Sequence, residues 1–330
     1  MNSTILKNIL IEYEQKRTKA QRTAELKKQE LYLSKPILQE IEDKLHSLSI
    51  STSKALIQNN DKALLENFEK QITDLKKQKL KILHDLNMTE EDLLPKYECP
   101  LCKDTGYIIN SDYTSFMCSC LKQKIFDIQY NKSNIFNLKL QSFDNFSDKV
   151  YSDKVNEEKY HVKFSPRENI NKIKIICDNF IKDFDDPQKK NLLFTGNTGL
   201  GKTFLSSCIA NELLKQHKNV LYQTAPVMFD TIIDYRFGKS NMDYNNLLSA
   251  DLLIIDDLGT EAMNQMKFAE LFNIINTRLL NQNKSTKTII STNLSLNNLY
   301  STYEERIVSR IVGNYTICYF FGDDIRFKAE

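Results

Sequence analysis

Apolar residues recur every three or four positions through two stretches near the start of the chain. This spacing predicts two amphipathic helices, because residues three and four apart lie on one face of an α-helix. Residues 50–61, rich in Ser, Asn and Gln, are expected to form the turn between them. The first stripe comprises Ile37, Leu38, Ile41, Leu45 and Leu48, and the second comprises Leu65, Phe68, Ile72, Leu75, Ile82 and Leu86, with Lys79 as a polar interruption.

The first 95 residues contain no Gly and only two Pro, which supports a helical domain over residues 1–95. Its stripes either form the core of a self-contained antiparallel bundle or leave one face for a partner protein. A basic cluster on the first helix either contacts phosphate or is a solvated face. That cluster consists of Lys16, Arg17, Lys19, Arg22, Lys27 and Lys28.

Beyond residue 165, short apolar runs alternate with longer helical stretches, after a polar linker at residues 125–165. Such alternation predicts an α/β fold in which helices cover both faces of a parallel sheet. The strands are expected at residues 192–195, 219–223, 252–255, 287–292 and 316–321, and the helices at residues 169–184, 202–216, 228–236, 265–282 and 304–311.

A glycine-rich loop follows the strand at residues 192–195 and precedes a helix. It matches the GxxxxGK[ST] phosphate-loop pattern, in which backbone N–H groups surround a phosphate. Lys202 is expected to neutralise the β- and γ-phosphates of a nucleotide, and Thr203 to bind Mg²⁺. The alternative, an incidental tight turn, does not explain the strand–loop–helix context. The expected nucleotide-binding residues are Gly196, Asn197, Thr198, Gly199, Leu200, Gly201, Lys202, Thr203 and Phe204.

Two acids end the apolar strand at residues 252–255. Asp256 is expected to hold Mg²⁺ through its water shell, and Asp257 to orient or deprotonate the attacking water. Active ATPases more commonly have Glu where this chain has Asp257, so slow or stimulated hydrolysis is expected. The strand at residues 287–292 should place Thr292 or Asn293 beside the γ-phosphate, where a polar side chain can position the water.

Four cysteines form two close pairs with a spacing that suits one tetrahedral zinc ion. The pairs are Cys99-Pro-Leu-Cys102 and Cys118-Ser-Cys120, and the second is CxC where CxxC is usual. Four thiolates leave no open position, so the predicted zinc, in a module at residues 96–124, is structural. Free thiols or redox pairs are the alternatives. The other cysteines, Cys177, Cys208 and Cys318, fall in apolar contexts and are expected in the core.

Composition limits the classes of function. The chain of 330 residues has 45 Lys and Arg against 43 Asp and Glu, so no large basic field indicates nucleic-acid binding and any DNA contact must be local. No apolar run approaches the roughly 18 residues of a membrane span. The charged start is unlike a secretory signal, and a cytoplasmic protein is expected.

These motifs together resemble an AAA+ ATPase, specifically the DnaC/DnaI group of bacterial replicative-helicase loaders. The resemblance rests on the phosphate loop, the two acids, Ser291-Thr292-Asn293 and Glu305-Arg306-Ile307-Val308-Ser309-Arg310, with Phe143-Asp144-Asn145-Phe146 and Asn276-Thr277-Arg278-Leu279 in support. It implies a P-loop AAA+ (ASCE) core at residues 166–330. It also implies that Asn293 is the sensor-1 residue, Arg310 an arginine finger acting on a neighbouring subunit's ATP, and Arg326 the sensor-2 arginine. Arg306 is less certain, and both Arg306 and Arg310 are alternatively a solvated helix face.

The same resemblance implies ATP, Mg²⁺ and structural Zn²⁺ as cofactors. It implies single-stranded DNA, the replicative helicase and further copies of the chain as partners, with residues 1–95 gripping the helicase. It also implies little or no helical lid after the last strand. Tyr235, Arg236, Lys239 and Tyr244 combine cations and rings as strand binding favours. An IstB-type transposition helper and a nucleotide-gated adaptor with little turnover remain as alternatives.

Overall fold

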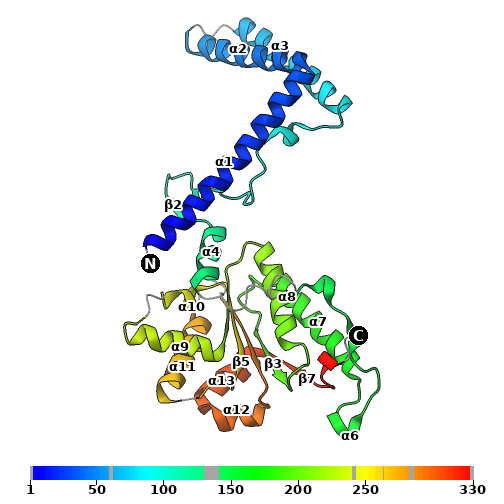
Figure 1. The fold of residues 1–330 in the computed structure, drawn as a ribbon, viewed down its shortest axis with the longest axis vertical. Coiled ribbons are helices and arrows are strands. Elements are labelled where there is room, and N and C mark those ends of the chain that lie inside the picture. Colours follow the sequence, from blue (N-terminus) through cyan, green and yellow to red (C-terminus); the bar gives the residue numbers. More distant parts are fainter. Residues whose placement is uncertain are drawn as a thin grey trace. The chain divides into compact units, whose positions relative to one another are not determined.

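The chain forms two compact units, residues 7–116 and a larger unit built mainly from residues 117–330 (Figure 1). No described helix combines the length and the apolar character that a membrane span requires. The computed structural model describes residues 3–58, 62–129, 141–239, 243–262, 264–281 and 286–327.

The smaller unit contains three long helices, α1 (Ser3–Ser34), α2 (Pro36–Gln58) and α3 (Lys62–Asp85). Helices α2 and α3 pack against each other, and Leu31, Leu38 and Leu83 form a buried cluster. The prediction of a turn at residues 50–61 is wrong for residues 50–58, because α2 continues to Gln58 through the serines and the threonine of that segment. Their hydroxyls donate to carbonyls four residues earlier, as Thr52 does to Leu48 over 2.8 Å. Residues 59–61 lie outside the described residues.

The polar interruption at Lys79 is explained by an ion-pair network that joins the three helices. Lys79 lies 3.0 Å from carboxylate oxygens of both Glu42 and Glu90, and Lys28 lies 2.6 Å from Glu42. Burial alone would raise the pKa of Glu42, but hydrogen bonds from Lys28, Tyr32 and Lys79 outweigh it and lower the pKa to about 2. Lys79 therefore interrupts the apolar stripe because its ammonium group forms ion pairs that join the helices.

The larger unit is built, within the described residues, on a five-stranded parallel sheet with the strand order β4-β5-β6-β3-β7. The α/β class predicted from the alternating pattern is confirmed. Strand β6 lies between β3 and β5, so the carboxyl ends of these three strands share one edge of the sheet. The strands are β3 (Asn191–Gly196), β4 (Val220–Thr224), β5 (Leu252–Leu258), β6 (Lys287–Thr292) and β7 (Tyr315–Phe320).

Helices cover both faces of this sheet (Figure 1). Helices α7 (Pro166–Lys182) and α8 (Lys202–Lys215) pack on one face, and α9 (Ala225–Arg236), α11 (Gln265–Leu280) and α13 (Glu305–Asn314) on the other. Helix α7 begins three residues before its predicted start because Ser165 and Glu168 cap it reciprocally. The pattern missed the short helices α10 (Asn245–Ser249) and α12 (Leu296–Thr302). Smaller elements are β1 (Tyr107–Ile109), β2 (Ser115–Met117), α4 (Ser119–Gln129) and α6 (Glu157–Tyr160).

Candidate functional site

The phosphate loop joins the end of β3 to the start of α8. Gly196, Gly199 and Gly201 all have positive φ angles, of 141°, 71° and 89°. A Cβ atom on Gly196 would lie 2.1 Å from the carbonyl oxygen of Phe320, so only glycine fits there. A loop of this conformation that leads directly into a helix N-terminus favours an anionic phosphate.

Lys202 is 6% exposed, and its ammonium donates three hydrogen bonds, two of them to the loop. Nζ donates to the carbonyl oxygens of Gly196 (2.6 Å) and Asn197 (2.7 Å) and to Oδ1 of Asn293 (2.7 Å). Burial lowers the pKa of Lys202, against the opposing charges of Asp257 and Asp256. The structure thus brings together Lys202 and Asn293, two residues assigned to the γ-phosphate from separate motifs.

Asp256, in the second half of β5, is 3% exposed and accepts hydrogen bonds from three hydroxyl groups. Thr203 donates to Oδ2 over 3.1 Å, Tyr222 donates to Oδ2 over 2.6 Å, and Ser291 donates to Oδ1. Thr203 and Asp256 are the two predicted Mg²⁺ ligands, and here they touch. Carboxylate and hydroxyl oxygens are the hard ligands that Mg²⁺ prefers, so this pair fits the ion.

Asp257 lies in an irregular part of β5, where the pairing with β6 shifts between Ile255 and Leu258. Its φ is 56°, and its N–H donates to the hydroxyl of Ser291 over 3.0 Å. Burial and the charge of Asp256 raise the pKa of Asp257, while Lys202 lowers it. A carboxylate with a raised pKa beside the phosphate site suits the predicted task of taking a proton from water.

A pocket of about 350 Å³ lies over the phosphate loop and collects Asp257, Asn293 and Arg326 in its lining, together with Gln141 and Phe204. Arg326 is held there by the Asp324 carboxylate through contacts that include Nε to Oδ1 at 3.0 Å and Nη2 to Oδ2 at 2.5 Å. The Asp324 carboxylate lies against the loop itself, since a Cβ atom on Gly199 would be 2.1 Å from it. The predicted sensor-2 arginine therefore has an acidic partner of its own chain.

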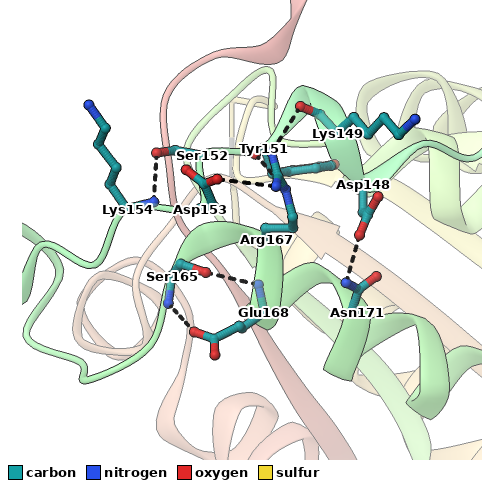
Figure 2. Close-up of polar contacts among 10 residues, drawn as sticks. All are labelled: Asp148, Lys149, Tyr151, Ser152, Asp153, Lys154, Ser165, Arg167, Glu168 and Asn171. Carbon is teal, nitrogen blue, oxygen red and sulfur yellow. Dashed lines mark hydrogen bonds and ion pairs between the residues drawn. The ribbon is translucent and has the colours of Figure 1, made fainter.

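A segment that precedes α7 supports the phosphate loop. The hydroxyl of Tyr151, a buried residue, donates to the carbonyl of Leu200 over 3.0 Å. Arg167, at the start of α7, holds this segment by donating to the carbonyl of Tyr151 over 3.2 Å and pairing with Asp153 at 3.3 Å (Figure 2). The end of the expected linker is thus tied to the loop, and no sequence motif had pointed to Tyr151.

The predicted arginine finger lies on α13. Arg310 stacks on Phe272, 4.5 Å from the ring centroid, and its Nε donates to Asn276 over 2.8 Å. Arg306 stacks on Phe272 at 4.6 Å and pairs with Glu304. Among the described residues that line the phosphate pocket, neither arginine occurs.

The four residues considered for DNA contact differ in burial and in their partners. Arg236 forms an ion pair with the buried Glu270 at 2.8 Å, and the hydroxyl of Tyr244 donates to the same carboxylate over 2.8 Å. The Tyr244 side chain is buried, whereas the Arg236 side chain stays 41% exposed beside its ion pair. Tyr235, which is 37% exposed, and Lys239 remain on the surface.

The four paired cysteines gather as predicted. The sulfur atoms of Cys99, Cys102, Cys118 and Cys120 all lie within 4.8 Å of one another. Four Zn–S bonds of about 2.3 Å in a tetrahedron would put the sulfurs about 3.8 Å apart, so the cluster fits one zinc ion. Asp104 closes the turn by accepting from the N–H of Cys99 over 2.8 Å, and Gly106 donates its N–H to the sulfur of Cys102 over 3.3 Å. The buried Cys177, Cys208 and Cys318 are core thiols, as expected.

Comparisons with known proteins agree with this reading of the larger unit. Residues 157–318 match the family model of the IstB-like ATP binding protein. The replicative helicase loader DnaC of Buchnera aphidicola subsp. Baizongia pistaciae is 28% identical over 178 residues, covering 52% of this chain and 70% of that protein. The insertion sequence IS1162 putative ATP-binding protein of Pseudomonas fluorescens is 30% identical over 92 residues, 28% of this chain and 40% of that protein.

The matches with DnaC of two further Buchnera aphidicola subspecies each span about half of those proteins, 51%. Among solved structures, DnaI is similar with a TM-score of 0.43 and 21% identity, over 56% of this chain and 94% of that one. The residues matched by the family model include the phosphate loop. Residues 157–318 are therefore similar to the IstB-like ATP binding proteins, and the chain is similar over 178 residues to a replicative helicase loader DnaC.

Proposed function

We propose that this protein is an ATP-dependent loader of the replicative DNA helicase onto single-stranded DNA during replication initiation. The match to DnaC over 178 residues carries the proposal, because it links the ATPase domain to proteins named as helicase loaders. The helical region at residues 1–95 is the proposed grip on the helicase. The cysteine cluster, loaded with Zn²⁺, is the proposed structural module that follows the grip along the chain and precedes the ATPase at residues 166–330.

In the proposed ATPase cycle, Lys202 binds the β- and γ-phosphates, and Thr203 and Asp256 would hold Mg²⁺, which would supply positive charge beside those phosphates. Asp257 accepts a proton from the attacking water, and Asn293, already 2.7 Å from Lys202, orients that water. Arg310 completes the site of an adjacent subunit in trans. Hydrolysis would then depend on self-association of the ATPase domains.

Complementation between two inactive variants tests the role of Arg310. Arg310→Ala and Lys202→Ala should each hydrolyse ATP at background rates. Their equal mixture should regain about a quarter of wild-type turnover, since each interface pairs one subunit's nucleotide site with its neighbour's arginine. The measurement is steady-state phosphate release with single-stranded DNA present. A mixture as inactive as its components would show that Arg310 does not act in trans. Wild-type protein without turnover would favour a nucleotide-gated adaptor.

Complex formation tests the loader role itself. The full chain, mixed with the replicative helicase of the same organism and with ATP and Mg²⁺, should elute as one complex in gel filtration with light scattering. Lys202→Ala, which cannot use ATP in this scheme, should change the stability of that complex or its release. Failure of the wild-type chain to bind the helicase would contradict the loader assignment.

The family match favours one second candidate, a helper ATPase for transposition, since the matching model is named for IstB-like proteins. Such a protein would deliver DNA to a transposase. The long helical region and the four paired cysteines are less expected in that role. Binding to a transposase of the same organism, with no binding to the helicase, would favour it.

A further inference from the structure

Tyr222 is a buried residue of strand β4 with a polar hydroxyl, and the mechanism above gives it no role. It is 2% exposed, and its hydroxyl lies 2.6 Å from Oδ2 of Asp256. In the sheet Tyr222 pairs with Ile254, two residues before Asp256 on β5. Residues two apart on a strand point to the same face, so the Tyr222 side chain reaches along that face to the carboxylate.

The Asp256 carboxylate is held from three sides. Tyr222 comes from β4, Ser291 comes from β6, the other neighbour of β5, and Thr203 comes from the first turn of α8. Tyr222 and Thr203 donate to Oδ2, while Ser291 donates to Oδ1. Both oxygens are therefore fixed in direction before any metal arrives.

The phenol can act here only as a donor toward Asp256. An ionised carboxylate only accepts hydrogen bonds, so the Tyr222 hydroxyl is the donor to Oδ2 of Asp256. A hydrogen bond with Ser207, a buried residue of α8, occupies the other side of the hydroxyl. The hydroxyl has one proton, and the Asp256 carboxylate accepts it, so the direction of the Tyr222–Asp256 hydrogen bond is determined.

We propose that Tyr222 is a positioning residue for the metal of the nucleotide site: its hydroxyl fixes the Asp256 carboxylate so that Asp256 and Thr203 present oxygens to Mg²⁺ bound with ATP. The proposal rests on the ATPase function proposed above. Groups that orient a metal ligand commonly change metal affinity by about 10- to 100-fold when removed. Tyr222 itself touches neither nucleotide nor metal.

The test compares the full-length wild type with Tyr222→Phe, which removes one oxygen and keeps the ring. Binding of a fluorescent ATP analogue is titrated with Mg²⁺. The half-saturating Mg²⁺ concentration should rise about 10-fold or more in Tyr222→Phe, while the affinity for the analogue in EDTA stays within about twofold of wild type. At saturating Mg²⁺, turnover should return toward the wild-type value.

Tyr303→Phe is the matched control. Tyr303 is 3% exposed, and its hydroxyl donates to the Glu261 carboxylate over 2.5 Å, so the same chemistry is lost elsewhere. Its thermal unfolding midpoint should fall like that of Tyr222→Phe, but its Mg²⁺ dependence should not move. If Tyr222→Phe does not fold, Ser207→Ala, which removes the other partner of the phenol, should shift the Mg²⁺ dependence in the same direction by less.

The outcomes separate this proposal from the one on which it rests. Equal Mg²⁺ dependence in wild type and Tyr222→Phe, or an equal shift in Tyr303→Phe, would reduce Tyr222 to a packing residue. If Ser207→Ala must stand in, an unchanged Mg²⁺ dependence in that variant would equally overturn the positioning role. Wild-type protein whose nucleotide binding ignores Mg²⁺ would instead overturn the proposed ATPase site.

Discussion

Replacing Lys202 by alanine should weaken binding of Mg²⁺ and ATP by about 100-fold or more and leave the protein folded. In the structure the ammonium contacts two carbonyls and the amide of Asn293 but no carboxylate. A bound phosphate would supply the anionic partner that this buried cation lacks, and a charge-assisted contact in a desolvated site is strong. The measurement is calorimetric titration of the full chain with ATP and Mg²⁺.

Lys287→Ala provides the control for this result. Lys287 is also buried, at 4% exposure against 6% for Lys202, and its ammonium likewise donates to backbone carbonyls, those of Asp186 and Lys189. It lies at the start of β6, whereas the phosphate loop follows the carboxyl end of β3, so the two lie at opposite ends of the parallel strands. This variant should lose stability and keep its nucleotide affinity. Unchanged affinity in Lys202→Ala would mean that the phosphates bind elsewhere.

The residues at the phosphate site were predictable because each sits in a local pattern with a fixed context. A glycine-rich turn between strand and helix, and acids at the end of an apolar strand, identify themselves without knowledge of the fold. The structure adds the order of the strands, in which β6 lies between β3 and β5 and brings Asn293 to Lys202. Local spacing therefore predicted the parallel sheet, and it predicted that the site lies at the carboxyl ends of its strands.

Contacts between distant residues could not be read in the same way. Tyr222 and Asp256 are 34 positions apart, and only the pairing of β4 with β5 makes the phenol a partner of the carboxylate. The same holds for Glu270, whose buried carboxylate binds both Arg236 and the buried Tyr244. The sequence shows a tyrosine in the strand at residues 220–224, but only the order of the strands in the sheet places it beside Asp256.

Removing the first cysteine pair should abolish zinc binding and unfold the segment around it. The wild-type chain should contain one zinc per molecule, and Cys99→Ser with Cys102→Ser should contain none. The strands β1 and β2 have only three residues each, too few to be stable without a cross-link. Structural zinc contributes about 10 kcal/mol or more in small modules, so its loss exceeds what this hairpin can recover.

Hydrogen exchange locates the effect and separates it from general destabilisation. The N–H groups of Cys99 and Gly106, which donate to Asp104 and to the Cys102 sulfur, should exchange rapidly in the double variant. Amides of β5 should stay protected, because the core of the ATPase domain does not depend on the metal. Cys177→Ala is the control: burial raises the pKa of Cys177, so it is a thiol and not a ligand, and zinc content should stay at one. Wild-type protein without zinc, and with four freely reactive thiols at these positions, would show that the cluster is not a metal site.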